Sequence, residues 1–292
     1  MGVAETRPPE PAGRVKVGDV ELAYLSEGEG PLVLLLHGFP DTAHSWDATR
    51  PGLGEAGYRA VAPFLRGYPP SGAAPDGRYD VDALGADVLG LIDALGGGPA
   101  VVVGHDWGAA AAMSAAAQRP SVVRLLVTVG IPHPRAIRPT LGFAWRTRHF
   151  VRLKMPGAAR ALRAKGGRMV DDLVRRWSPA WDFPPEATAA AKACFAQPGA
   201  AEAAVAYYRQ MGPKPPKSLV APVQVDTVAF AGETDGAIVD IGTYERARRH
   251  HQAAYDVIRL PGGHFMHREH PELFNEKLLE VLRRRVGGDA FP

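Results

Sequence analysis

The segment Gly104-His105-Asp106-Trp107-Gly108 limits the fold of this chain more than any other feature. It follows a short apolar run at residues 101–103 and leads into an alanine-rich stretch that is typical of a helix. Glycines on either side of the central residues allow a sharp turn between a strand and a helix, which exposes the central side chain at the carboxyl edge of a sheet. The sequence therefore predicts a nucleophile elbow whose central residue is Asp106 and not the usual serine.

Strand-like and helix-like runs alternate on both sides of this turn. Strands are expected at residues 20–25, 31–37, 58–64, 101–103, 125–129, 223–230 and 255–260. Helices are expected at residues 81–95, 241–250 and 271–286, and the apolar residues of the first of these recur with a helical period. The alternation predicts an α/β fold with a mostly parallel central sheet and helices on both of its faces.

The alternation is interrupted between residues 132 and 217, where helical patches and Pro/Gly breaks occur without a strand-like run. We therefore expect a core formed by residues 14–131 and 218–292, with an inserted helical lid at residues 132–217. Residues 1–13 are Pro-rich and polar, so we expect a disordered leader without the apolar stretch of a secretory signal.

Composition argues against several classes of function. The chain has 292 residues, a net charge of +3 and one cysteine, Cys194, which excludes an intramolecular disulfide. The charge is too small to indicate nucleic-acid binding, and no apolar run reaches the roughly 18 residues of a membrane-spanning helix. The histidines show no metal-ligand spacing. We expect a cytoplasmic protein without metal or cofactor, and the sequence leaves a homodimer open.

An aspartate at the elbow indicates chemistry at a saturated carbon. A carboxylate has no proton to lose before it attacks, so Asp106 can displace a leaving group and become an alkyl ester. Water must then attack the carbonyl carbon of that ester. This second step requires a base, an acid that orients the base, and backbone N–H groups for the oxyanion.

Two loops supply the oxyanion hole and the base. His37-Gly38-Phe39-Pro40 ends a predicted strand, so the N–H groups of Phe39 and Trp107 are the candidate oxyanion hole. His264 follows the last predicted strand between glycines and an aromatic residue, which is typical of the base. His267 and His270 are its nearby rivals.

A third loop supplies the orienting acid. Asp235 lies in Gly232-Glu233-Thr234-Asp235, directly after a predicted strand, where it can hold the imidazole in the tautomer that accepts a proton from water. Glu233 is the rival. The loop after the 125–129 strand is the alternative place for this acid, but it contains no carboxylate.

These motifs, in this order, resemble the α/β-hydrolase fold and, within it, the soluble epoxide hydrolases and their haloalkane dehalogenase relatives. The resemblance extends over residues 15–286 and includes Leu65-Arg66-Gly67-Tyr68. It implies hydrolysis of a small-molecule epoxide by water through a covalent ester on Asp106, without a cofactor.

In that family two lid tyrosines hold the epoxide oxygen. Tyr208, directly before Arg209, matches one of them. The other family position lies seven residues before a Pro-Gly pair and is occupied here by His149, so the resemblance implies a His/Tyr variant. Tyr207, His37 and Trp107 are expected to contact the substrate.

Other functions stay open. Halide displacement uses the same nucleophile and requires only N–H donors, which Trp107 and a lid tryptophan (Trp145, Trp177 or Trp181) can provide. A fluoroacetate dehalogenase would need arginines just after the nucleophile, and none is present. A non-catalytic sensor of small ligands is the alternative outside enzymes, but a pure binding protein has no need of a base.

The lid segment 135–176 is strongly basic. It contains twelve Arg or Lys residues and only two acids, Asp171 and Asp172. A solvated basic face, a surface for an acidic partner, and the attraction of anionic substrates such as epoxy fatty acids each account for this composition.

Overall fold

The computed structural model describes residues 11–212, 214–237 and 240–287. An eight-stranded sheet with the strand order β1-β2-β4-β3-β5-β6-β7-β8 forms its centre. β1 and β2 pair antiparallel, as do β2 and β4, and every later pair is parallel. The strands are β1 (Gly13–Val17), β2 (Val20–Glu27), β3 (Leu32–Leu36), β4 (Arg59–Pro63), β5 (Ala100–His105), β6 (Val123–Val129), β7 (Thr227–Gly232) and β8 (Tyr255–Leu260).

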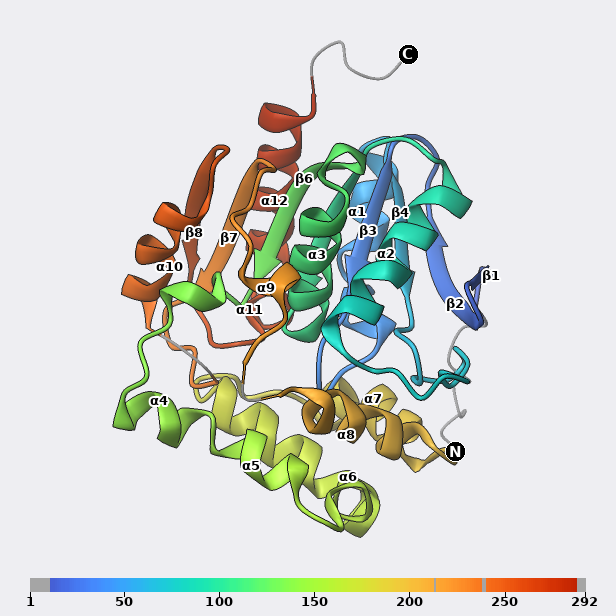
Figure 1. Cartoon of the computed structure of the whole chain (residues 1–292), viewed down its shortest axis with the longest axis vertical. Coiled ribbons are helices and arrows are strands. Elements are labelled where there is room, and N and C mark those ends of the chain that lie inside the picture. The colour runs from blue at the N-terminus through green and yellow to red at the C-terminus, as the bar shows by residue number, and fades with distance from the viewer. Residues whose placement is uncertain (1–10, 213, 238–239, 288–292) are drawn as a thin grey trace, which may run out of the picture.

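Helices cover both faces of the sheet and gather below one end of it. They are α1 (Arg50–Glu55), α2 (Val81–Leu95), α3 (Trp107–Gln118), α4 (Leu141–Arg146), α5 (Arg148–Lys154), α6 (Ala158–Trp177), α7 (Ala189–Ala196), α8 (Ala200–Gln210), α9 (Lys217–Val220), α10 (Ile241–Ala247), α11 (Met266–Glu269) and α12 (Pro271–Arg285). Figure 1 shows α2 and α3 in front of the sheet, α12 behind it, and α4 to α8 as a separate layer below. None of the described helices is long and apolar enough to span a lipid bilayer.

The apolar runs form the central strands because both faces of these strands are covered. All six residues of β5 are buried, and so are all six of β7. A parallel strand that is covered on both faces needs a continuous apolar sequence and not an alternating one. The fold class expected from the alternation is confirmed, with an eight-stranded, mostly parallel sheet.

Three expected elements differ from the structure. Gly13 lies in β1 and Ala12 N–H donates to the Tyr24 carbonyl, so the expected disordered leader is wrong for residues 12 and 13, while residues 1–10 lie outside the described part of the chain. The strand expected at 223–230 is β7, which begins at Thr227, because Val223 makes only an isolated bridge to His251. The helix expected at 241–250 ends at Ala247 and continues as one 3₁₀ turn.

Candidate active site

Asp106 lies at a sharp turn between β5 and α3. Its φ of 50° and ψ of −117° are in a region that side-chain-bearing residues rarely adopt, and holding such a conformation costs about 1–3 kcal/mol. A Cβ at Gly104 would lie 2.3 Å from the carbonyl oxygen of Gly108, so the turn closes only because residue 104 is glycine. The surrounding structure therefore holds Asp106 at the carboxyl end of β5, where it is 7% exposed.

The loop after β3 supplies a hydrogen bond to this carboxylate. β3 pairs with β5 in a register that places Leu36 beside Gly104, so the loops that follow the two strands meet. The Phe39 N–H donates to Asp106 Oδ1 at 2.9 Å. A Cβ at Gly38 would lie 2.3 Å from the Asp106 Cβ, and the absence of a side chain at residue 38 permits this approach. Trp107 begins α3, where backbone N–H groups have no acceptor within the helix.

His264 and Asp235 lie on the loops after β8 and β7. These strands pair with Gly232 beside Leu260, which brings the two loops together. His264 Nδ1 donates to Asp235 Oδ2 at 2.9 Å, and His264 Nε2 lies 3.4 Å from Asp106 Oδ2. Asp235 Oδ1 also accepts the Ala237 N–H at 2.6 Å. The rival acid Glu233 is exposed.

The two carboxylates determine the charge of His264. Burial opposes protonation of this ring, but Asp235 and Asp106 outweigh it and raise the pKa of His264 to about 10. The two rival histidines, His267 and His270, do not contact Asp235. The His267 ring is buried beside Ser45 Oγ, and His270 precedes α12 at a half-buried position.

No pattern in the sequence predicted that the C-terminal end of α6 holds the loops that carry His264 and Asp235. The carbonyl of Trp177 accepts the N–H groups of both Gly236 and His264, each at 3.0 Å. Ser178 Oγ accepts the Phe265 N–H at 3.1 Å and donates to Glu269 Oε1 at 2.5 Å. Residues 177 and 178 therefore fix the backbone at and directly after His264.

Tyr208 lies on α8 and packs against the residues on both sides of the proposed nucleophile. Its ring makes edge-to-face contacts with Phe39 and Trp107, each with 5.2 Å between ring centroids. Its hydroxyl is buried beside the Trp107 side chain, which can only donate, and the hydroxyl hydrogen meets no acceptor among the described residues. Burial, followed by the charge of Asp106, raises the pKa of Tyr208 well above its ordinary value, so the hydroxyl is protonated at neutral pH and can donate.

His149 lies on α5, with its ring centroid 6.1 Å from that of Tyr208. Burial, followed by the charge of Arg176, lowers its pKa to about 3, so the ring is neutral. His149 Nδ1 lies 3.2 Å from the Arg146 carbonyl, which can only accept, so Nδ1 carries the proton and Nε2 is left as an acceptor. Donation of a hydrogen bond from Nε2 to a substrate oxygen, as the resemblance implied, does not fit this arrangement.

Tyr207 and His37 hold loops together, which corrects their assignment as substrate contacts. The Tyr207 hydroxyl donates to the Arg66 carbonyl at 2.8 Å. The His37 ring is fully buried, accepts the Leu65 N–H at Nε2 (3.1 Å) and donates from Nδ1 to the Gly38 carbonyl (3.0 Å). Neither side chain has a polar hydrogen left for a ligand.

The part of the chain from β3 to the start of α12 matches a known family. The model of the α/β-hydrolase fold family matches residues 31–271, which include every loop described above. The chain belongs to the α/β-hydrolase fold family. No metal-binding group of three or more His, Cys, Asp or Glu residues occurs in the described parts of this α/β-hydrolase.

Relatives of this α/β-hydrolase include named epoxide hydrolases. Epoxide hydrolase 3 of Mus musculus is 30% identical over 289 residues, which cover 94% of this chain and 77% of the mouse protein. The AB hydrolase superfamily protein YfhM of Bacillus subtilis is 29% identical over 91% of this chain and 95% of its own length. The solved structure of the Cif epoxide hydrolase from Acinetobacter nosocomialis has the same fold, with a TM-score of 0.82 at 22% identity over 92% of this chain and 88% of that one.

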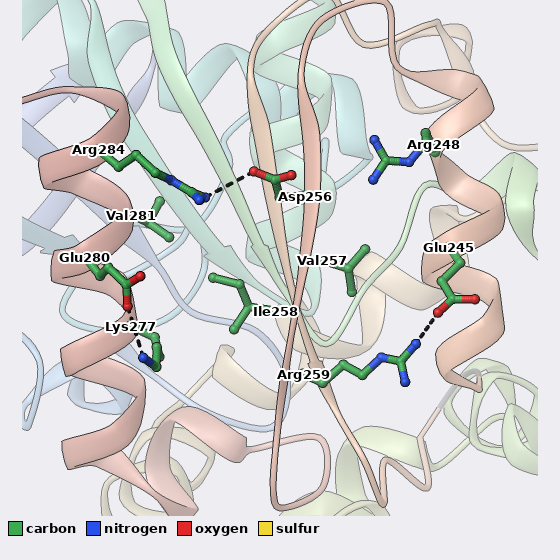
Figure 2. Close-up of a pocket in the computed structure, with 10 residues that line it drawn as sticks. All are labelled: Glu245, Arg248, Asp256, Val257, Ile258, Arg259, Lys277, Glu280, Val281 and Arg284. Atoms are coloured by element: carbon green, nitrogen blue, oxygen red, sulfur yellow. Dashed lines mark hydrogen bonds and ion pairs between the residues drawn. The ribbon is translucent and has the colours of Figure 1, made fainter.

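A surface pocket of about 490 Å³ lies elsewhere, between α10, the edge strand β8 and α12 (Figure 2). Six of its seven charged side chains are paired with one another: Asp256 with Arg284, Lys277 with Glu280, and Arg259 with Glu245. Because each carboxylate of this pocket is held in an ion pair, the pocket is a weaker candidate for a reaction site than the surroundings of Asp106.

Proposed function

We propose that this α/β-hydrolase converts an epoxide into a vicinal diol through a covalent ester on Asp106. One observation carries the proposal: the two oxygens of the Asp106 carboxylate have different surroundings. Oδ1 accepts the Phe39 N–H at 2.9 Å, while Oδ2 lies 3.4 Å from His264 Nε2. We assign residues 132–217, which carry Tyr208, as the lid of the site.

In the first step, Oδ2 of Asp106 attacks an epoxide carbon and the C–O bond of the ring breaks. The departing oxygen takes the proton of the Tyr208 hydroxyl. A phenol whose hydrogen has no acceptor among the described side chains is suited to this role, because that hydrogen need not leave another acceptor before it is donated. The product of this step is a hydroxyalkyl ester of Asp106.

In the second step, neutral His264 removes a proton from water as the water oxygen bonds to Cγ of Asp106. The former Oδ1 becomes the oxyanion, which the Phe39 N–H already contacts and which the Trp107 N–H is assigned to stabilise. The intermediate then collapses, the diol oxygen takes the proton from His264, and Asp106 is left as the carboxylic acid. Asp106 releases this proton to solvent and the Tyr208 phenolate takes one up, so that both groups are restored.

The charge of His264 links the two steps. With both carboxylates ionised, the pKa of His264 is raised to about 10, so the free enzyme holds a protonated ring that cannot act as a base. Ester formation removes the negative charge of Asp106, which is one of the two groups that raise this pKa. Alkylation therefore lowers the pKa of His264 and makes the base available when water has to be activated.

The test is to trap the ester. His264→Gln is expected to react once with an epoxide and then stop, so that the intact protein gains the mass of the substrate. His270→Gln, which makes the same exchange beyond α11, is the matched control and is expected to turn over normally. One turnover of the wild-type protein in heavy-oxygen water is expected to leave label in Asp106. Unlabelled Asp106 beside labelled diol would exclude the ester route.

Halide displacement is the second candidate function, and the position of Trp177 favours it. The Trp177 ring lies 5.4 Å from that of His264 and its Nε1 is buried without an acceptor among the described residues, so it offers an N–H donor near the elbow. Halide release from haloalkanes, without diol formation from any epoxide, would select this function.

A further inference from the structure

Arg176 lies in the last turn of α6, next to the residue that holds the base loop. Its guanidinium carbon is 5.8 Å from the centroid of the Trp177 ring, and that ring is 4.7 Å from His149 and 5.4 Å from His264. The guanidinium of Arg176 therefore lies beside the Trp177 ring, which contacts both His149 and His264 at the proposed active site. It belongs to the basic segment 135–176, for which the sequence alone offered three explanations.

Two nitrogens of this guanidinium, Nε and Nη2, are shielded from water and meet no acceptor among the described residues. A buried charged donor without an acceptor is costly, and proteins generally pair such groups. Burial, followed by the like charges of Arg148 and Arg152, lowers the pKa of Arg176, so its surroundings oppose its charge. Among the described residues, these two nitrogens of the Arg176 cation therefore have no anionic partner.

The two nitrogens form one edge of the guanidinium, and this edge fits a carboxylate. Arg66 uses the same pair in this protein: its Nε and Nη2 donate to the two oxygens of Asp87, each at 2.6 Å. Arg78 binds Asp80 in the same way. Two parallel N–H groups match the two oxygens of a carboxylate, which gives a strong and directional contact.

We propose that Arg176 binds a carboxylate of the substrate, and that this hydrolase acts on epoxides that carry a carboxylic acid. The inference rests on the proposed epoxide hydrolysis and specifies its substrate class. The distance between the acid and the epoxide ring is then set by the separation of Arg176 from Asp106, so chain length becomes a determinant of specificity.

The experiment compares terminal epoxy acids of increasing chain length with the methyl ester of each, and uses styrene oxide as an uncharged reference. For the wild-type protein, kcat/KM is expected to be higher for the acid than for its ester at one optimal chain length. In Arg176→Met the acid-to-ester ratio of kcat/KM is expected to fall about tenfold or more, which corresponds to about 1.4 kcal/mol. Arg176→Lys keeps the charge but loses the paired donors, and an intermediate ratio is expected.

Arg175→Met is the matched control. Arg175 is exposed in the same helical turn, lies 3.9 Å from Asp172 and covers the Phe183 ring, so the variant loses the same charge and is expected to keep the wild-type ratio. An equal loss for acid and ester in Arg176→Met would assign Arg176 a structural role and overturn the inference. So would a wild-type protein that does not distinguish acid from ester, although diol formation would still support the proposed function.

Failure of the proposed function would look different. If the wild-type protein hydrolyses none of these epoxides, the proposed reaction fails, and calorimetric binding of the saturated acids then tests the subsite alone. Binding that weakens about tenfold or more in Arg176→Met but not in Arg175→Met would support a carboxylate site. Equal binding by all three proteins would overturn it.

Discussion

Replacing Asp106 by asparagine should lower the pKa of His264, because the uncharged amide reproduces the charge of the ester. In the wild-type protein Asp235 and Asp106 together raise this pKa to about 10, and Asp106 Oδ2 lies 3.4 Å from the ring. Loss of one carboxylate at such a distance shifts a pKa by about 1–3 units. We therefore expect His264 to titrate between roughly pH 7 and 9 in Asp106→Asn, a change of about 1.4–4 kcal/mol in the free energy of protonation.

The assay is a pH titration of ¹⁵N-labelled histidine by NMR, with His264 assigned from His264→Gln. Asp47→Asn, which removes the same charge at an exposed site, is the control and should leave His264 unchanged. A second readout is the free energy of unfolding. Because the folded-state pKa of His264 is raised, its protonation stabilises the wild-type fold fully below about pH 6.5, and this stabilisation is lost as the pH rises through about 10. In Asp106→Asn this stabilisation of the fold by protonated His264 should disappear at a lower pH than in the wild-type protein.

Two results would refute this reasoning. If His264 titrates at the same pH in both proteins, Asp106 does not hold the proton, and alkylation cannot release the base. If the wild-type His264 already titrates near its ordinary value of 6.5, the ring is neutral before the substrate arrives, and no coupling between the steps is needed.

Three further predictions concern the groups around this ring. Tyr208→Phe should slow ester formation about 10²–10⁴-fold in rapid-quench kinetics while ester hydrolysis changes less, because the phenol acts only on the departing oxygen; an unchanged first step would remove Tyr208 from the mechanism. Ser178→Ala should lower the free energy of unfolding by about 1–3 kcal/mol, because the buried Phe265 N–H loses its acceptor, and should slow ester hydrolysis more than ester formation; equal slowing of both steps would argue against control of the base. Gly38→Ala should reduce the yield of trapped ester, because the new methyl group would lie 2.3 Å from the Asp106 Cβ; a normal yield would show that the loop can move aside.

The residues at the ends of the strands could be predicted because the topology of the sheet determines their positions. Asp106, Asp235 and His264 each follow a parallel strand, and the carboxyl ends of parallel strands meet at one edge of a sheet. Recognising strands and turns in the sequence was therefore enough to bring these side chains together. The hydrogen bond of His264 to Asp235 at 2.9 Å and the 3.4 Å approach of His264 Nε2 to Asp106 Oδ2 follow from this arrangement.

The helices α4 to α8 could be predicted only in part, because their contacts depend on how short helices pack. The spacing that indicated His149 placed it near Tyr208, but the sequence could not show that the Arg146 carbonyl determines its tautomer. Nor could it separate Arg176 from the eleven other basic residues of its segment, because only tertiary packing buries two of its nitrogens. β1 was missed because a five-residue edge strand with alternating exposure has no continuous apolar run.

The double acceptor at Trp177 has a consequence for engineering. Its carbonyl accepts hydrogen bonds from the backbone N–H groups of both Gly236 and His264. This peptide therefore positions two loops of the sheet domain, although it lies between residues 132 and 217. A chimera that takes all of residues 132–217 from another relative would also replace Trp177, whose carbonyl holds the loops that carry Asp235 and His264. Grafts that retain this peptide and exchange only the helices around it should preserve the chemistry while they change which molecules reach it.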